Sequence, residues 1–340
     1  MNDLINIQKK LIPQVIEIME RRYSILRQIS LSEPIGRRTL SNMLEISERI
    51  VRSETEVLKE QNLINVAVSG MTVTEEGLEL LDQLKDIMND VMGLSQLQHK
   101  VKEKLGIKKV IIVPGDFEKN ESLLKDVAKQ GAEYFLSILK DNSVVAVTGG
   151  STMLEFANSL KSDKKYNQTT IVPARGGVGK DVETQSNNIV AILGKKLGAH
   201  YKLLHVPDEL GVEAMKTLSL EPEIHKTLNF VLNTDILVFG IGRADEMATR
   251  RKLPKEQVKE ILSKGAVGEA FGYYFNKNGE IVYELNTVGI KLETFKSVKN
   301  NIAIFAGSSK AEAVTAISKL NDNMVIITDE QSAYKILEVN

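Results

Sequence analysis

The sequence predicts an α/β protein made of two parts. Residues 1–78 are expected to form a winged helix-turn-helix domain, residues 79–105 a linker helix, and residues 106–340 a larger Rossmann-like domain. The first prediction comes from short helical stretches followed by a two-stranded hairpin pattern. The second comes from short apolar runs that alternate with helical stretches after residue 105, which is typical of a parallel sheet with crossover helices. A chain of 340 residues is long enough to bury both cores.

The composition excludes several kinds of site. The 44 Lys and Arg residues balance 45 Asp and Glu residues, so a DNA-binding surface must rest on local pattern and not on net charge. The chain lacks Cys, which excludes disulfides and thiolate metal sites, and its four His residues lack metal-ligand spacing. Because there is no signal-peptide pattern and no apolar run near about 18 residues, we expect a cytoplasmic protein without a membrane partner, metal or cofactor.

The first residues carry apolar side chains at helical spacing. Pro13 is expected to start a new helix or to kink a longer one, because proline fits the first turn of a helix and disrupts later turns. We expect this stretch to pack against the helices that follow. The apolar positions are Leu4, Ile7, Leu11, Val15 and Ile18.

The helix-turn-helix motif is predicted from the order of the next elements. Pro34-Ile35-Gly36 interrupts the helical pattern, Glu45-Ile46 makes a tight turn, and Ser47 is a suitable N-cap for a third helix. Ser69-Gly70 is a hairpin turn signal. The predicted helices are Tyr23–Ile29, Arg37–Leu44 and Ser47 to about Gln61, and the predicted strands are Leu63–Val68 and Met71–Thr74.

The third helix has a polar face suited to the DNA major groove. Its polar side chains recur at intervals of three and four residues, where arginine can read guanine edges. Arg37 and Arg38 begin the second helix, where phosphate contacts are expected. The alternative is a solvated face, because the helix also carries Glu48, Glu54, Glu56 and Glu60 and the wing has no Lys or Arg. Attraction should be modest, so tight binding needs at least a dimer. The predicted DNA-binding residues are Arg37, Arg38, Ser47, Arg49, Arg52 and Ser53.

The connecting segment Glu75–Leu105 lacks proline and is rich in helix-forming residues. Its apolar residues recur at three- and four-residue steps, which suits a seam between two helices, although Gly93 weakens the pattern. A dimerising linker helix and simple packing on the next domain are both consistent with this spacing. The seam residues are Leu84, Ile87, Val91 and Leu94.

The C-terminal domain is predicted to form a mainly parallel sheet with an inserted hairpin. The hairpin, Phe271–Leu285, turns at Lys277-Asn278-Gly279. Ligands of open parallel sheets bind at the carboxyl ends of the strands. The predicted strands are Val110–Val113, Val144–Val147, Thr170–Val172, Leu203–Val206, Ile236–Phe239, Ile302–Phe305 and Val325–Ile327.

The loops at these strand ends are rich in glycine and hydroxyl groups. In the most informative loop, Val144–Val147 runs directly into Gly149-Gly150-Ser151-Thr152, and a helical pattern follows. A helix N-terminus offers an anion unpaired N–H groups and a favourable dipole. Gly240-Ile241-Gly242 does not complete a dinucleotide fingerprint. The other glycine loops are Ala174–Gly177, Gly240–Gly242 and Ala306–Lys310, and four of them at one sheet edge predict an anion pocket.

The predicted ligand is small, polar and anionic. Arg175 and Lys310 are expected to hold phosphate oxygens, the first as a fork and the second as a point charge. Arg250 is either a third cation or part of a solvated face. Glu269 is either an acceptor for sugar hydroxyls or a surface residue, and Gln185 is open to both interpretations. The predicted pocket residues are Gly149, Gly150, Ser151, Thr152, Arg175, Gln185, Arg250, Glu269 and Lys310.

Five longer motifs carry a resemblance to a known family. They are EPIGRR (Glu33–Arg38), VAVTGGST, VPARGGVGKDV (Val172–Val182), EAFGYYFN (Glu269–Asn276) and AGSSKAEA (Ala306–Ala313). Together they resemble the SorC family of sugar-responsive bacterial transcription regulators over nearly the whole chain. The resemblance implies a repressor of a glycolytic operon, with an effector domain like sugar-phosphate isomerases and deaminases. It also implies that fructose 1,6-bisphosphate loosens a tetramer on operator DNA, and that the pocket residues above occupy effector positions, with Ser151 in place of a familiar Thr.

Two functions are compared at this point. The preferred one is a homo-oligomeric repressor, dimer or tetramer, that binds operator DNA and a phosphorylated sugar. The alternative is a sugar-phosphate isomerase or deaminase with an appended helical domain. Such enzymes need a positioned acid or base. Glu269 and Asp181 are near the loops, but no His is close to a glycine turn, which favours a sensor over an enzyme.

Overall fold

The computed structural model describes residues 10–177, 181–208 and 210–339, and the chain divides into two compact units. One unit contains the chain up to Leu97 and the segment Glu118–Leu123, and the other contains Gln98–Phe117 and the chain from Leu124 onward. The main chain therefore passes between the units at three points. The predicted helical positions Leu4 and Ile7 and the motif residues Val178–Lys180 lie outside the described residues.

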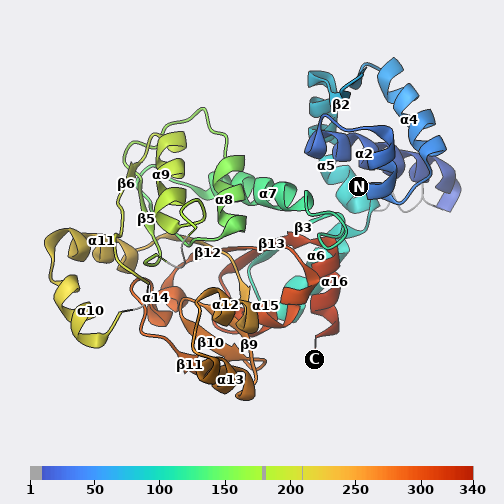
Figure 1. Ribbon diagram of the computed structural model, residues 1–340. Coiled ribbons are helices and arrows are strands. Elements are labelled where there is room, and N and C mark those ends of the chain that lie inside the picture. Colours follow the sequence, from blue (N-terminus) through green and yellow to red (C-terminus); the bar gives the residue numbers. More distant parts are fainter. Residues whose placement is uncertain (1–9, 178–180, 209, 340) are drawn as a thin grey trace. The chain divides into compact units, whose positions relative to one another are not determined.

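The N-terminal unit is a winged helix-turn-helix, as predicted. Pro13 is the first residue of a long helix, Glu45 ends the next helix with a φ of 53°, and the Ser47 hydroxyl caps the third by accepting from the Ile50 N–H at 3.3 Å. The elements, seen in Figure 1, are α2 (Pro13–Ser32), α3 (Arg37–Leu44), α4 (Glu48–Glu60), β1 (Ile64–Ala67), β2 (Gly70–Val73) and α5 (Glu75–Val91).

The predicted linker forms two helices, α5 and α6 (Leu94–Leu105). They are separated at Gly93, whose φ of 74° lies in the left-handed region that glycine adopts without strain. The predicted seam on α5 packs against α2, where Ile87 and Val91 join a cluster with Tyr23. This packing differs from the interpretation in which the seam packs on the next domain, because α5 completes the N-terminal unit that precedes it in the chain. Dimerisation through this segment stays a prediction.

The main sheet of the C-terminal unit is parallel, and its seven described strands follow the order β3-β13-β12-β7-β4-β5-β6. Its strands β4 and β7 are continuously apolar, as is typical of strands buried on both faces, whereas the buried strand β13 ends in the polar residues Thr328 and Asp329. The strands are β3 (Lys109–Val113), β4 (Val144–Val147), β5 (Thr170–Pro173), β6 (His200–Tyr201), β7 (Ile236–Phe239), β12 (Asn300–Ile304) and β13 (Met324–Asp329). The predicted Rossmann-like class is confirmed.

The strand order reverses between the neighbours β4 and β7. From β4 the chain continues to β5 and β6 on one side, whereas β7, β12 and β13 lie on the other side. Loops that leave such a pair of strands diverge to opposite faces and open a crevice at the carboxyl edge. The Gly149-Gly150 and Gly240-Ile241-Gly242 loops follow these two strands, so both flank the crevice.

A second sheet of four described strands is antiparallel, in the order β11-β10-β9-β8. It contains the predicted hairpin as β10 (Tyr273–Asn276) and β11 (Ile281–Glu284), and adds β8 (Gly242–Arg243) and β9 (Ala266–Ala270). Figure 1 shows this sheet with α13 at one end of the unit and α10 and α11 at another. The remaining helices are α7 (Leu123–Ile138), α8 (Ser151–Ser159), α9 (Ser186–Leu197), α10 (Val212–Ser219), α11 (Pro222–Leu232), α12 (Ala244–Arg250), α13 (Lys255–Ser263), α14 (Leu292–Ser297), η1 (Ser308–Lys310), α15 (Ala311–Ser318) and α16 (Glu330–Glu338).

The predicted strand Leu203–Val206 is wrong. Pairing with β5 involves the two residues of β6, and the chain then leaves the sheet edge. The side-chain amide of Asn187 bonds both the N–H and the C=O of Leu204, at 2.9 and 3.1 Å, in place of a neighbouring strand. Leu204 and Val206 are apolar because they pack in a separate cluster with Val288.

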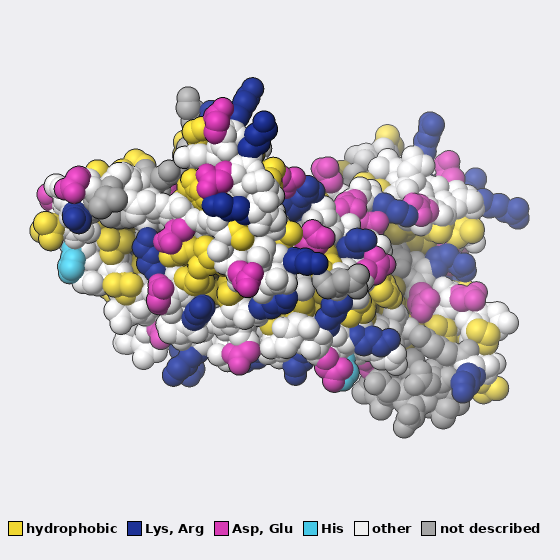
Figure 2. All heavy atoms as spheres, turned by 90° about the horizontal axis from the view of Figure 1, so that it is seen from below, with side chains coloured by type: hydrophobic (Ala, Val, Ile, Leu, Met, Phe, Trp, Pro, Cys, Tyr) yellow, Lys and Arg dark blue, Asp and Glu magenta, His cyan; other side chains and the backbone are white. Residues whose placement is uncertain are grey.

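The surface charges are mixed. Figure 2 shows Lys and Arg side chains interspersed with Asp and Glu over the face in view, in keeping with the balanced composition. Among the described residues, no helix combines the length and apolarity needed to cross a membrane, and no cluster of His, Asp or Glu is arranged to hold a metal ion.

Candidate ligand pocket and DNA-binding face

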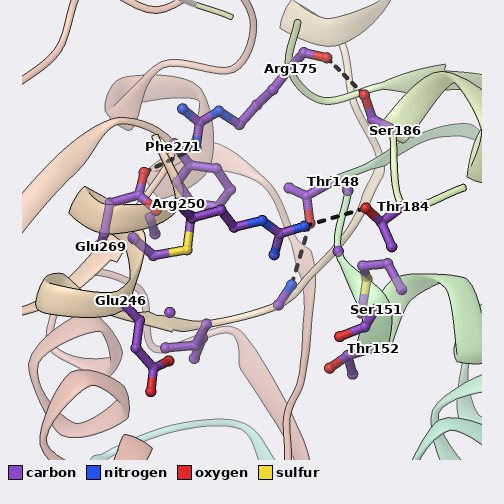
Figure 3. A pocket seen from close by; sticks show the side chains of 18 of the residues that line it. Thr148, Ser151, Thr152, Arg175, Thr184, Ser186, Glu246, Arg250, Glu269 and Phe271 are labelled. Carbon is purple, nitrogen blue, oxygen red and sulfur yellow. Dashed lines mark hydrogen bonds and ion pairs between the residues drawn. The ribbon is translucent and has the colours of Figure 1, made fainter. Parts of the chain in front are cut away.

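A pocket lies at the carboxyl ends of β4 and β7, where the strand order reverses. Its volume is about 250 Å³, near the lower end of the range for small-molecule sites, so it suits a small metabolite better than a dinucleotide. The structure brings together all nine residues predicted for the pocket, and Figure 3 labels Ser151, Thr152, Arg175, Arg250 and Glu269 among them. The full set is Gly149, Gly150, Ser151, Thr152, Arg175, Gln185, Arg250, Glu269 and Lys310.

The β4 loop presents the N-terminus of α8 to the pocket. Gly150 is the N-cap residue, with a φ of 120° that side-chain-bearing residues rarely adopt, and α8 begins at Ser151. A Cβ at Gly149 would lie 2.7 Å from the Thr184 carbonyl oxygen, so this close approach requires glycine. Ser151 and Thr152 add hydroxyls beside the first N–H groups of the helix, an arrangement suited to phosphate oxygens.

Lys310 supplies a cation at the end of the β12 loop. Asp329, fully buried, accepts from the Gly307 N–H at 2.9 Å and so fixes the loop that carries the lysine. Lys310 makes no ion pair within the described part of the chain. Burial lowers the pKa of its ammonium group, and the charges of Glu246 and Asp329 only partly offset this effect. A bound anion would compensate the buried charge.

Two further predicted pocket residues, Arg250 and Gln185, lie at helix ends. Arg250, the last residue of α12, is exposed and donates weakly to the Thr184 hydroxyl at 3.4 Å. Gln185 is the N-cap residue of α9. Arg250 therefore places an exposed guanidinium at the pocket wall, and Gln185 places its side-chain amide near Gly177.

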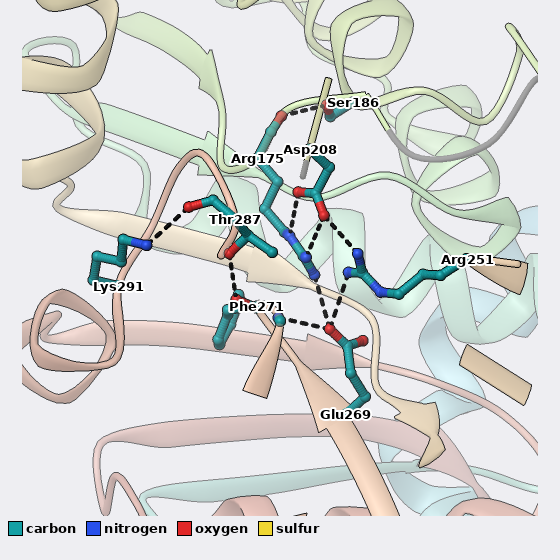
Figure 4. A network of polar contacts seen from close by, with 9 residues as sticks. Arg175, Ser186, Asp208, Arg251, Glu269, Phe271, Thr287 and Lys291 are labelled. Carbon is teal, nitrogen blue, oxygen red and sulfur yellow. Dashed lines mark hydrogen bonds and ion pairs between the residues drawn. The ribbon is translucent and has the colours of Figure 1, made fainter. Parts of the chain in front are cut away.

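Arg175 is engaged by carboxylates. Its Nε and Nη2 atoms donate to Asp208 at 2.9 and 2.7 Å, and Nη1 donates to Glu269 at 3.0 Å. Arg251 bridges the same two carboxylates, at 2.6 Å to Asp208 and 3.2 Å to Glu269. Figure 4 shows this network of two arginines and two acids. The Arg175 fork thus binds carboxylates in the described structure, and its binding of phosphate stays a prediction.

Glu269 is a buried and ionised carboxylate at the pocket wall. Burial alone would raise the pKa of its carboxyl group, but the charges of Arg175 and Arg251 and the Gly272 N–H hold this pKa below its ordinary value. All three donors reach Oε1, the Gly272 N–H at 2.7 Å. Among the described residues, Oε2 accepts no hydrogen bond, so Glu269 keeps an acceptor for a ligand.

Sequence reasoning missed several residues of this site. Arg251 stands in the basic run Arg250-Arg251-Lys252, and nothing in the sequence distinguishes its buried side chain from its exposed neighbours. Asp208 had no signal, because its loop follows a strand that was wrongly placed. Thr184 and Glu246 line the pocket as well and were not among the predicted residues.

The predicted DNA-binding residues are distributed over the start of α3 and the outer face of α4. Arg49, Arg52 and Ser53 are exposed, and Arg52 donates to Glu56 at 3.1 Å. Arg38 is exposed and Arg37 is partly buried at the α3 N-terminus. Ser47 is the α4 cap, so its hydroxyl has a structural role in addition to the predicted one. Contact of these residues with DNA stays a prediction.

One of the four glutamates on α4 does not oppose DNA binding. Glu54 is buried on the inner face, where Oε1 accepts from Arg21 at 2.9 Å and Oε2 from Arg22 at 2.7 Å. Burial would raise the pKa of the Glu54 carboxyl, but bonding to the two arginines lowers it. The negative charge on the exposed face of α4 is therefore smaller than the count of glutamates in the sequence indicated.

A winged helix-turn-helix joined to a polar pocket with unpaired acceptor and cationic groups defines a ligand-responsive transcription regulator. The family model described as "CggR N-terminal DNA binding domain" matches residues 18–88. The model described as "Putative sugar-binding domain" matches residues 89–338. The chain belongs to the family of central glycolytic genes regulators, within the SorC group of transcription regulators, and is not an enzyme.

Individual relatives support this membership. The central glycolytic genes regulator of Bacillus subtilis is 44% identical over 337 residues, and that of Priestia megaterium is 40% identical over 338 residues, each covering 99% of both chains. A SorC family regulator from Enterococcus faecalis is 33% identical, with a TM-score of 0.67 over 71% of this chain and 99% of its own. The full-length sorbitol operon regulator SorC from Klebsiella pneumoniae, 15% identical, shares the fold over 94% of this chain and 99% of its own, with a TM-score of 0.64.

Proposed function

We propose that this chain represses a glycolytic operon by binding operator DNA, and that fructose 1,6-bisphosphate in the pocket releases the DNA. The observation that carries the proposal is the pairing of anion-binding and hydroxyl-binding groups in one pocket. Lys310 is a cation without an ion pair in the described chain, and Glu269 keeps an unbonded carboxylate oxygen. A phosphorylated sugar satisfies both groups together. The names of the relatives support a glycolytic role.

The proposed binding mode assigns each part of the ligand to a wall of the pocket. One phosphate lies at the α8 N-terminus, where Ser151, Thr152 and Lys310 contact its oxygens. The second phosphate is held by Arg250, whose guanidinium lies beside Thr184, with Gln185 nearby. The sugar hydroxyls donate to Glu269, whose ionised form is the better acceptor.

The effect on DNA requires that the ligand bind the free and DNA-bound forms with different affinities. The chain offers a covalent route for this coupling. Phe117, the residue before Glu118–Leu123, lies beside Gly307 of the Lys310 loop. Within the N-terminal unit, Asn120 donates to Gln28 at 2.9 Å and Lys119 pairs with Glu45, in the turn between α3 and α4, at 2.8 Å. We propose that an ordered Lys310 loop shifts this segment and the spacing of the heads in a homo-oligomer, dimer or tetramer.

The test combines a thermal-shift screen of phosphorylated sugars with operator binding. The DNA is a labelled duplex that the protein has selected from a random pool, and its binding is followed by fluorescence anisotropy. Fructose 1,6-bisphosphate should raise the Tm, because a ligand of the folded chain adds RT ln(1 + [L]/Kd) to the free energy of unfolding. It should also weaken operator binding. Unchanged Tm and operator affinity would refute the proposal. Steady conversion of the sugar phosphate would instead support the alternative function of an isomerase or deaminase.

A further inference from the structure

The buried charge network beside the pocket contains four side chains whose formal charges cancel. Arg175 and Arg251 face Asp208 and Glu269, and each of these side chains is at most 9% exposed. Both carboxylate oxygens of Asp208 accept hydrogen bonds, Oδ1 from Arg175 and Oδ2 from both arginines. Glu269 uses Oε1 alone.

This asymmetry is costly for a purely structural cluster. A buried ion pair offsets its desolvation only when its hydrogen-bonding groups are satisfied, and an uncommitted carboxylate oxygen forfeits part of that gain. Three donors, from Arg175, Arg251 and Gly272, crowd onto one oxygen of Glu269. In Figure 4 no dashed line joins the other oxygen to the residues drawn, none of the described residues donates to it, and Glu269 lines the pocket.

We propose that Arg251 and Asp208 are positioning residues for ligand selection, which hold Glu269, through Oε1, so that Oε2 is kept for a hydroxyl of the bound sugar phosphate. This inference rests on the proposed sugar-phosphate function. Asp208 accepts hydrogen bonds from both arginines and so fixes the positions of their guanidinium groups. Arg251 in turn fixes the Glu269 carboxylate by donating to Oε1. Because the network is neutral, it selects hydroxyl groups without itself attracting phosphate, which is left to Lys310 and Arg250.

The first test compares two ligands that differ in their hydroxyl groups. Fructose 1,6-bisphosphate and hexane-1,6-diol bisphosphate both carry two phosphates on a six-carbon chain, but the second lacks the sugar hydroxyls. Calorimetry on the full chain gives the ratio of their Kd values. The wild type should favour the sugar by at least about tenfold, since a site built to accept a hydroxyl rejects an analogue without one. Arg251→Gln and Asp208→Asn should reduce this ratio by about tenfold.

A double-mutant cycle separates positioning from general structural damage. Glu269→Gln should already remove the preference for the sugar, so adding Arg251→Gln should leave the ratio unchanged. Arg251→Lys keeps the charge and should retain most of the ratio seen in the wild type. If Arg251→Gln weakens both ligands equally in the wild-type background, the residue is structural and the proposal is overturned.

A second measurement needs no ligand. The carboxyl ¹³C signal of Glu269, assigned by its loss in Glu269→Gln, reports the protonation of this group. It should titrate at a higher pH in Arg251→Gln than in the wild type, because one of the two neighbouring positive charges is gone. An unchanged titration would overturn the role of Arg251. If the wild type binds neither bisphosphate, the proposed function fails, and this titration alone decides whether Arg251 controls Glu269.

Discussion

Each unit of the chain holds one buried glutamate between two arginines, but the two glutamates differ in what remains of their hydrogen-bonding capacity. In the N-terminal unit, Glu54 gives one oxygen to Arg21 and the other to Arg22. In the C-terminal unit, Glu269 receives Arg175, Arg251 and a backbone N–H on a single oxygen.

The comparison separates a structural ion pair from one that serves a ligand. Glu54 fixes α4 to α2, and both of its carboxylate oxygens accept from arginines. Glu269 has a comparable charge balance, yet it lines a pocket, and its Oε2 accepts no hydrogen bond from the residues that the structure describes. Counting charged contacts would treat the two alike, whereas accounting for each oxygen atom distinguishes them.

The largest expected effect comes from the other end of the pocket, at Lys310. Lys310→Met should weaken fructose 1,6-bisphosphate binding on the order of 10- to 100-fold, because a charged hydrogen bond to phosphate contributes about 1.5–3 kcal/mol. Hexane-1,6-diol bisphosphate should lose as much, which contrasts with the selective effect at Glu269. Calorimetry measures both affinities, with the exposed Lys299→Met as the control. A loss confined to the sugar ligand would show that Lys310 does not hold phosphate.

On the DNA-binding face, Arg52→Ala should weaken binding to the selected operator by about 1–3 kcal/mol if Arg52 makes a bidentate base contact. The change should spare the thermal stability, since Arg52 is exposed and its pair with Glu56 is a surface one. Anisotropy titrations with operator and with scrambled duplex separate base contact from phosphate contact. Normal operator affinity would remove Arg52 from the interface.

Glu54→Gln should destabilise the N-terminal unit by about 1–2 kcal/mol, because both arginines lose a charged acceptor but remain partly hydrated. Sugar-phosphate binding should be unchanged, which is the reverse of the Glu269→Gln result. Urea unfolding of the full chain measures the first effect, and Glu60→Gln, an exposed position on the same helix, is the control. Equal loss in both variants would mean that Glu54 is not a specific anchor.

The pH dependence should be the smallest effect. The pKa of Glu54 is lower in the folded chain than its ordinary value of 4.5, so the unfolded chain binds the proton more readily. The stabilisation is therefore complete above pH 4.5 and is lost as the pH falls through the folded pKa. Urea unfolding at a series of acidic pH values should show a shallower loss in Glu54→Gln. Parallel pH profiles would contradict the assignment.

Much of the architecture could be predicted from local sequence, because helix caps, turn residues and strand periodicity act over a few neighbours. The Arg37–Leu44 helix and the Ser47 cap are examples, as is the grouping of the glycine loops at one sheet edge. Strand order could not be read this way, since it depends on which strands pair across long stretches of chain. Leu203–Val206 failed for a related reason, because a side-chain amide from α9 replaced a strand partner.

Which charged residues of the pocket are buried and which are exposed could not be predicted from the sequence. Arg250 and Arg251 are adjacent in the chain, yet one is exposed and the other has a side chain that is 3% exposed. The sequence likewise does not distinguish Glu54 from the exposed glutamates of α4, because its burial depends on the contact with Arg21 and Arg22 of α2. In both cases the function of a charged residue followed from its partners in space.

The central claim is that occupation of the pocket and binding of DNA are coupled. Linkage requires reciprocity, so the factor by which fructose 1,6-bisphosphate weakens operator binding must equal the factor by which operator weakens binding of the sugar. Calorimetric titration of the sugar into the full chain, with and without saturating operator duplex, measures this directly. We predict a weaker sugar affinity in the presence of operator, by the factor found in the DNA titration. Equal sugar affinities with and without operator would contradict the account.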